Sequence, residues 1–187
     1  DYFTANLKLC RNSRYNKEMF KYLSYVRQGT IMDEPIKKGK VEDFIEARNI
    51  CFTNKKRKEI NKMVNKYYTR DREHMFIAFD GAENPYNQDT YIYEGLELMS
   101  MKTENKLQLT KNETYTITHF NEECITILNN DEDECCIPHH LFHTNFMLCY
   151  CITTHRSQGL TLKGRVNIHE YNKIKFKIKK NHIDLSN

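Results

Sequence analysis

Long apolar runs are missing from this chain. No run approaches the ~20 apolar residues that a helix needs to cross a bilayer, so the sequence predicts no membrane partner. The amino terminus also lacks a signal-peptide pattern. It opens at Asp1-Tyr2-Phe3 without a Met, which suggests a fragment of a longer protein.

Two phosphate-binding signals are missing as well. The sequence has no G-x-x-x-x-G-K-[ST] loop and no Asp-Glu pair after an apolar strand. Those groups hold the phosphates and Mg²⁺ in P-loop enzymes. We therefore expect the chain alone to bind neither ATP nor Mg²⁺.

The cysteines show no secreted disulfide framework. There are seven, an odd number, and their spacing is irregular, which favours a reduced, intracellular protein in the cytoplasm or nucleus. A cluster of soft ligands offers a competing zinc site: Cys135, Cys136, His139, His140 and His143, with Cys149 and Cys151 nearby. Adjacent cysteines in a strand point opposite ways, and no C-x-x-C pair exists, so we assign no metal ligand.

The remaining composition fits a folded protein with a polyanionic partner. The 187 residues are 39% hydrophobic and 12% aromatic, with a net charge of +4, which suits one or two small domains. Cations concentrate at residues 55–58 and 173–180. Such clusters suit a polyanion, although each alone is equally typical of a solvated face.

The hydrophobic pattern changes along the chain. Helical spacing follows Asn16, and residues 50–68 read as a strand, a tight turn and a helix with Ile60, Met63, Val64 and Tyr67 on its apolar face. Residues 72–145 carry short alternating runs between polar turns, which predicts an inserted β-barrel of about five strands and no helix.

The most informative stretch is residues 146–162. An apolar run, 146–152, predicts a buried strand, and the small polar turn 153–159 follows at its carboxyl end, where α/β sheets place ligand sites. A last strand is expected at 165–169. The turn sequence Thr-Thr-His-Arg-Ser-Gln-Gly-Leu-Thr resembles motif V of superfamily 1 DNA helicases, in the form found in the RecD-type branch.

Three other segments resemble the same family, in the same order. Leu9-Cys-Arg-Asn-Ser-Arg14-Tyr resembles the L-x-x-N-x-R segment that opens the second RecA-like domain, and Ile50 to Asn61 resembles I-x-x-T-N-x-x-V-x-x-I-N. Residues 93–99 and 109–117 resemble the inserted barrel, although Asn112-Glu-Thr-Tyr115 lacks the Gly that is typical of the family's N-G-E-x-Y-x-V phrase. The resemblance implies an α/β fold with three segments: 1–71 and 146–187 form a RecA-like parallel-sheet domain, and 72–145 form the small β-barrel.

The resemblance also implies roles for individual residues. Arg14 would reach the terminal phosphate of ATP as the catalytic arginine, because a guanidinium fork suits phosphate oxygens. His155, Gln158 and Gly159 would couple the nucleotide to DNA. The residues that would contact single-stranded DNA are Thr53, Asn54, Thr154, His155 and Ser157. Arg57, at a position often apolar in the family, would make the helix edge more basic.

The predicted function is that of a C-terminal motor-domain fragment of an ATP-dependent DNA helicase, in replication or repair. Its partners would be single-stranded DNA and an upstream RecA-like domain of the same chain, with ATP and Mg²⁺ bound in the full-length parent. The final family motif, A-L-S-R, has only Asp184-Leu-Ser-Asn187 as a counterpart. A non-catalytic nucleic-acid-binding module with a degenerate helicase fold is the alternative.

Overall fold

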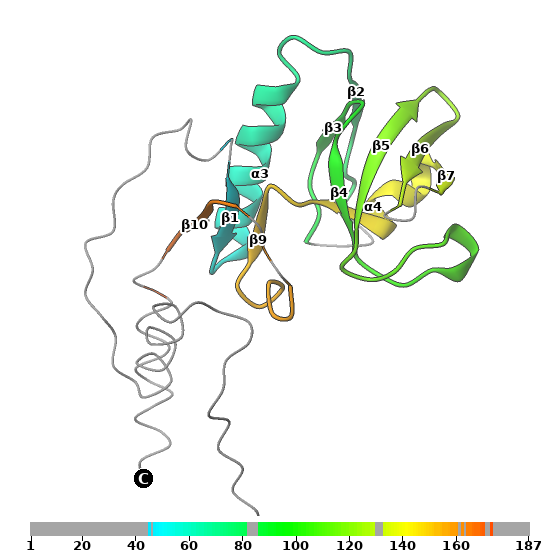
Figure 1. Cartoon of the computed structure of the whole chain (residues 1–187). Helices are drawn as coiled ribbons and strands as arrows, with labels where there is room; N and C mark the ends of the chain where they lie inside the picture. Colours follow the sequence, from blue (N-terminus) through cyan, green and yellow to red (C-terminus); the bar gives the residue numbers. More distant parts are fainter. Residues whose placement is uncertain are drawn as a thin grey trace, which may run out of the picture. The chain divides into compact units, whose positions relative to one another are not determined.

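The computed structural model describes residues 45, 47–81, 86–129, 133–160, 162, 164–170 and 173. The chain divides into two units, Asp1–Lys38 with Asn172–Asn187, and Gly39–Tyr171. The second unit contains every strand described below (Figure 1). Arg14, the helix predicted after Asn16 and the Asp184–Asn187 motif lie outside the described residues.

The first layer of the second unit is a parallel sheet with one helix. Strand β1 (Arg48–Cys51) lies between β10 (Val166–Ile168) and β9 (Cys151–Thr153), parallel to both. Helix α3 (Asn54–Tyr68) follows β1 directly, as the sequence predicted. Ile60 and Val64 pack on Cys51 and Cys151 of the sheet.

The apolar face predicted for α3 is only half right. Met63 and Tyr67 are 36% and 45% exposed, so they lie off the buried face. That face instead carries three polar residues, Arg57, Asn61 and Asn65, each at most 2% exposed. Their hydrogen bonds to neighbouring backbone replace the apolar contacts that periodicity alone had suggested.

Residues 75–148 form antiparallel strands in two sheets. The larger has the order β7-β6-β5-β4-β8 and the smaller is the pair β2-β3. The bounds are β2 (Met75–Ile77), β3 (Thr90–Ile92), β4 (Glu97–Ser100), β5 (Thr114–Phe120), β6 (Cys124–Leu128), β7 (Glu134–Pro138) and β8 (Phe146–Leu148). Alternate residues of β5 and β6 point into one core, as period-two patterning predicts.

The sheet order ends at β7 and β8, and no ladder joins these two edges within the described ranges. The inserted barrel therefore stays a prediction. Three helical turns also occur where none was predicted: η1 (Asn105–Leu107), η2 (His139–Leu141) and α4 (Phe142–Asn145). None is longer than four residues, too short to show helical periodicity in a sequence.

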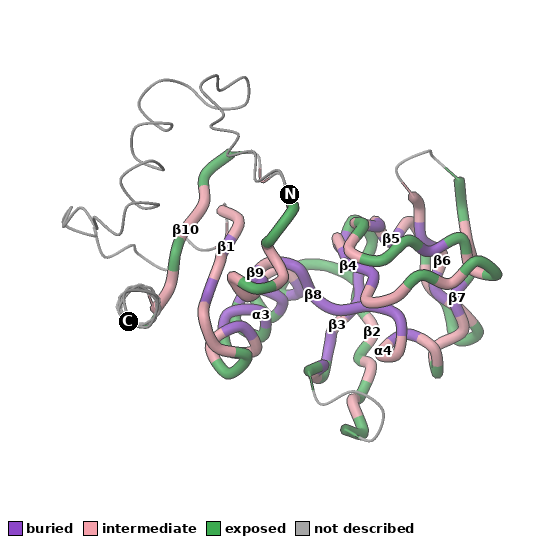
Figure 2. Tube along the Cα trace, turned by 90° about the horizontal axis from the view of Figure 1, so that it is seen from below, coloured by how far each residue is buried: buried purple, intermediate pink, exposed green. Residues whose placement is uncertain are grey.

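The apolar run 146–152 forms two strands rather than the one predicted. β8 pairs with β4 and is buried throughout, whereas β9 pairs with β1 (Figure 2). Asn61 of α3 spans the break: its amide donates to the carbonyls of Leu148 (3.2 Å) and Cys151 (3.1 Å) and accepts from Cys151 N–H (2.7 Å). Cys149 and Cys151 consequently lie in different hydrophobic clusters.

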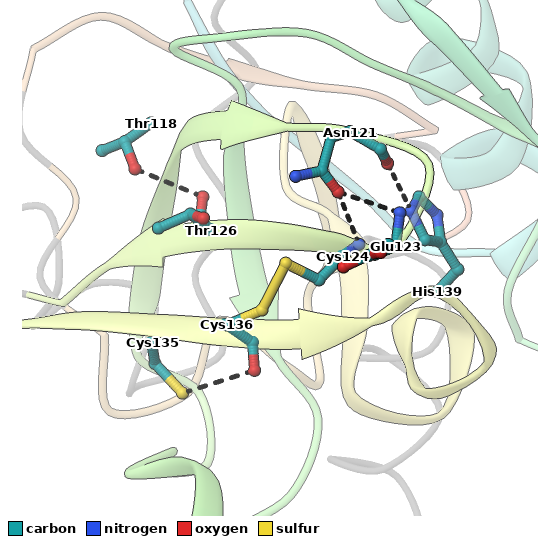
Figure 3. The surroundings of a disulfide bond; sticks show 8 residues. All are labelled: Thr118, Asn121, Glu123, Cys124, Thr126, Cys135, Cys136 and His139. Carbon is teal, nitrogen blue, oxygen red and sulfur yellow. Dashed lines mark hydrogen bonds between the residues drawn. A yellow bond between two sulfur atoms is a disulfide. The ribbon is translucent and has the colours of Figure 1, made fainter.

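A disulfide joins Cys124 of β6 to Cys136 of β7 (Figure 3). The sequence had predicted reduced cysteines, so this pairing was not foreseen. The two residues are 12 apart in sequence, and their Cα atoms are 6.0 Å apart across one antiparallel ladder. Because β7 is an outer strand of its sheet, the bond fastens a sheet edge.

Candidate nucleic-acid interface

Three predicted segments meet at one edge of the parallel sheet. Thr53 follows the end of β1, the turn 154–159 follows β9, and His169 and Glu170 follow β10. Parallel strands end on the same side, and backbone hydrogen bonds hold the ends together: Thr154 N–H donates to Cys51 O (2.8 Å) and His169 N–H to Ile50 O (2.7 Å). The residues taken from two separate motifs are thus neighbours.

Thr53 begins helix α3. Its backbone is extended (φ −102°, ψ 147°), and its hydroxyl accepts a hydrogen bond from Lys56 N–H at 3.2 Å. This is N-capping geometry, in which a short hydroxyl side chain satisfies one of the free amides of the first turn. Asn54, the first residue of the helix, is exposed.

Glu170 occupies the amides of this turn. Its carboxylate accepts from Phe52 N–H (3.2 Å) and Thr53 N–H (2.8 Å), and the Thr53 hydroxyl lies 2.9 and 3.0 Å from its two oxygens. These two amides are therefore already paired and are not free for a phosphate. Glu170 was missed, although it directly follows the last predicted strand, where a site residue is expected.

The motif turn after β9 is largely closed by its own backbone. The N–H groups of Arg156 and Ser157 donate to Thr153 O (2.9 and 3.0 Å). The Ser157 hydroxyl donates to Thr154 O (2.9 Å). Gly159 has φ +83°, a left-handed conformation that favours glycine. His155, Gln158 and Gly159 are exposed, so these three offer the turn's accessible surface.

The basic helix edge differs from the prediction. Arg57 is 2% exposed, donates from Nε to Asn54 Oδ1 (3.1 Å) and from its Nη2 to Tyr86 O. Burial lowers the pKa of this guanidinium, and it adds no cation to the surface. Lys56 pairs with Glu59 at 2.8 Å, and Lys58 lies 5.8 Å from the Phe79 ring centre.

Two side chains beside the edge are partly desolvated. Burial lowers the pKa of Arg156, which donates to Asn112 Oδ1 at 3.3 Å. His169 Nε2 lies 2.9 Å from Asn49 Oδ1, and burial, with a smaller effect of Lys56, lowers the pKa of this imidazole. His169 therefore adds a partly buried, hydrogen-bonded imidazole to this edge beside Glu170.

The part of the chain that the structure describes forms no cluster of metal ligands. No group of three or more His, Cys, Asp or Glu residues there could hold a metal ion. Cys136, one candidate in the zinc alternative, is bonded to Cys124 instead. No helix within the described ranges is long and apolar enough to span a membrane.

The comparisons with known proteins point to one kind of fold. A Pif1 helicase studied with a second copy at forked double-stranded DNA matches 89% of this chain with TM-score 0.60 at 14% identity. This chain therefore shares its fold with part of that Pif1 helicase. Bacteroides Pif1 bound to single-stranded DNA matches 83% of the chain, with TM-score 0.57 and 14% identity.

A third solved structure, Bacteroides Pif1 with ADP-AlF3 and single-stranded DNA, matches 88% of the chain with TM-score 0.58 at 14% identity. The chain spans 45%, 43% and 46% of these three proteins. No family model and no curated protein matches the sequence. The RecD-type branch stays a prediction from the motif alone.

Proposed function

We propose that the chain is the second motor domain of an ATP-dependent superfamily 1 helicase and that it contacts single-stranded DNA at the carboxyl edge of its parallel sheet. One observation carries this proposal. Thr53 with Asn54, and the turn 154–159, come from two motifs about 100 residues apart, yet the Thr154–Cys51 hydrogen bond joins them at one edge. The fold shared with DNA-bound Pif1 helicases supports it.

The exposed groups suit a nucleic-acid backbone. The Asn54 and Gln158 amides can donate to phosphate oxygens, and His155 adds an imidazole donor. Thr154 and Ser157 line the same turn, although the Ser157 hydroxyl already bonds Thr154 O. The Thr53 hydroxyl would donate to a phosphate oxygen only if it gave up its bond to Glu170, because its single proton is donated there.

The nucleotide chemistry belongs to the proposed parent protein. Arg14 would meet the terminal phosphate, and His155, Gln158 and Gly159 would couple that site to DNA. The phosphate-binding loop and the carboxylates for Mg²⁺ would come from an upstream RecA-like domain. We expect no ATP hydrolysis by the 187-residue chain alone, because its sequence lacks both signals.

DNA binding is the test of this proposal. A labelled oligothymidine should bind the chain weakly, and affinity should fall steeply between about 50 and about 200 mM salt, since phosphate contacts release counterions. Asn54→Ala combined with Gln158→Ala should weaken binding severalfold. The matched control is Asn105→Ala with Gln108→Ala, which removes two exposed amides from η1 and its end.

Salt-independent affinity, or equal loss in both double variants, would count against the proposed edge. Absence of binding at low salt would remove the proposal altogether. Thermal unfolding of each variant separates loss of contact from loss of fold.

A further inference from the structure

A polar cavity lies at the opposite edge of the parallel sheet from the proposed DNA-binding edge. It has a volume of about 440 Å³ and is lined by residues of β1, α3, β4 and the segment before β10. Arg48 is the first residue of β1, and its N–H donates to the carbonyl of Arg165, which directly precedes β10. The cavity therefore sits where the strands begin, whereas Thr53 and Thr154 sit where they end.

Positively charged residues outnumber acidic residues in the described lining of this cavity. Three arginines line it, Arg48, Arg72 and Arg165, and Glu97 is the one acidic residue among its described lining. Glu97 pairs with Arg48 at 2.7 Å, with both side chains more than 40% exposed. The pair leaves a net positive cavity, which suits an anion.

Arg72 is held in place by aromatic rings. Its guanidinium carbon lies 5.5 Å from the centre of the Tyr68 ring and 5.3 Å from that of Tyr93. The rings are themselves fixed, because Tyr68 stacks on Tyr150 at 5.8 Å and the Tyr93 and Tyr150 hydroxyls are hydrogen-bonded. A guanidinium stacked on rings keeps its N–H edge for a ligand and loses little freedom on binding.

The kind of ligand that fits follows from the guanidinium group of Arg72. A planar guanidinium donates two parallel N–H bonds to phosphate oxygens, and the neighbouring arginines supply further charge. The three arginines of the lining disfavour an apolar ligand, and the lining tyrosines already pack on each other or on Arg72. A phosphate group therefore fits these residues better than a stacked base.

We propose that this cavity binds a phosphodiester group of single-stranded nucleic acid, as a second contact point at the amino edge of the sheet. The inference rests on the proposed function, since the nucleic-acid strand bound at the carboxyl edge would continue to this cavity. Arg72 is the residue that binds the phosphate, and Tyr68 and Tyr93 position it. Arg48 and Arg165 add to the positive electrostatic potential of the cavity.

The test compares Arg72→Gln with Lys106→Gln in the 187-residue chain. Lys106 is an exposed cation of η1 outside the cavity. Titration of a labelled oligothymidine at several salt concentrations should show roughly tenfold weaker binding for Arg72→Gln, with the salt slope reduced by about one. Arg72→Lys should recover part of the loss, because it keeps the charge but not the fork.

A direct readout comes from the arginine Nε–H signals in NMR spectra. Oligothymidine should move the Arg72 signal. If inorganic phosphate moves it and oligothymidine does not, the cavity is a free-anion site and the proposal is overturned. Equal affinity of Arg72→Gln and Lys106→Gln also overturns it while leaving the proposed function intact, whereas a wild-type chain that binds no DNA overturns both.

Discussion

At the scale of single residues, Glu170 satisfies hydrogen-bond donors of the β1–α3 turn. Two amides and one hydroxyl of that turn converge on its carboxylate. An amide left unpaired at a helix start costs free energy, and an anion there is favoured by the helix dipole as well. The same features that attract a phosphate have here attracted a side chain.

Glu170→Gln should destabilise the second unit. The substitution removes the charge and replaces one acceptor oxygen with an NH₂ group that faces backbone N–H donors. We expect the free energy of unfolding to fall by about 1–3 kcal/mol, the range for hydrogen bonds to a charged group. Urea denaturation followed by circular dichroism measures this.

Glu122→Gln is the matched control for that substitution, since Glu122 is exposed in the turn between β5 and β6. It should change stability by less than about 0.5 kcal/mol. Equal unfolding midpoints for the two variants would show that the Glu170 bonds contribute no net stability.

At the scale of elements, local sequence patterns predicted the helix and strands of the β1–α3 unit, but they did not predict which strands pair. The run Ile50 to Tyr68 gave a strand, turn and helix because each part has a local signal. The run 146–152 looks like one strand, but its halves pair with β4 and β1, whose paired residues are 46 or more positions away in sequence. Asn61 bridges the break between the two halves, and nothing in the sequence marks Asn61 as bonded there.

The Cys124–Cys136 bond gives an element-scale prediction. The bond joins residues 12 apart in sequence. Closing a loop of that length lowers the conformational entropy of the unfolded chain, which stabilises the folded state by about 2–3 kcal/mol. Cys136→Ser should lower the free energy of unfolding by that amount, and a reducing agent should lower the wild type to the same level. Chemical denaturation with and without reductant measures both effects.

Cys135→Ser tests whether the effect belongs to the bond. Cys135 is the adjacent residue of β7 and carries a free thiol. This variant should keep its response to reductant, whereas Cys136→Ser should lose it. A non-reducing peptide map that finds free thiols at Cys124 and Cys136 would contradict the prediction.

At the scale of the whole molecule, the motif resemblance anticipated the shared fold, because motif V combines a strand end with a polar turn. It did not anticipate Glu170 or the buried Arg57, since both depend on which strands become neighbours. Whether residues 72–145 close into a barrel also depends on pairing between strands that are far apart in the sequence. Arg14 lies outside the described residues, so its role rests on the sequence.

The last prediction concerns the longer helicase that we propose contains this chain. If Arg14 meets the terminal phosphate, Arg14→Ala should slow DNA-stimulated ATP hydrolysis by roughly 10³ or more while DNA binding stays nearly intact. A residue that merely caps a helix would change stability by about 1 kcal/mol and leave turnover unaffected. Steady-state phosphate release and oligonucleotide titration separate these outcomes.

Arg11→Ala is the matched control for Arg14, because it removes the same charge three residues earlier. His155→Ala in the same protein should reduce the stimulation of hydrolysis by DNA more than the basal rate, since His155 is exposed at the edge where DNA would bind. If Arg11→Ala and Arg14→Ala behaved alike, and His155→Ala kept full stimulation, the motor interpretation would lose its support. The chain would then be better described as a nucleic-acid-binding module that retains the helicase fold.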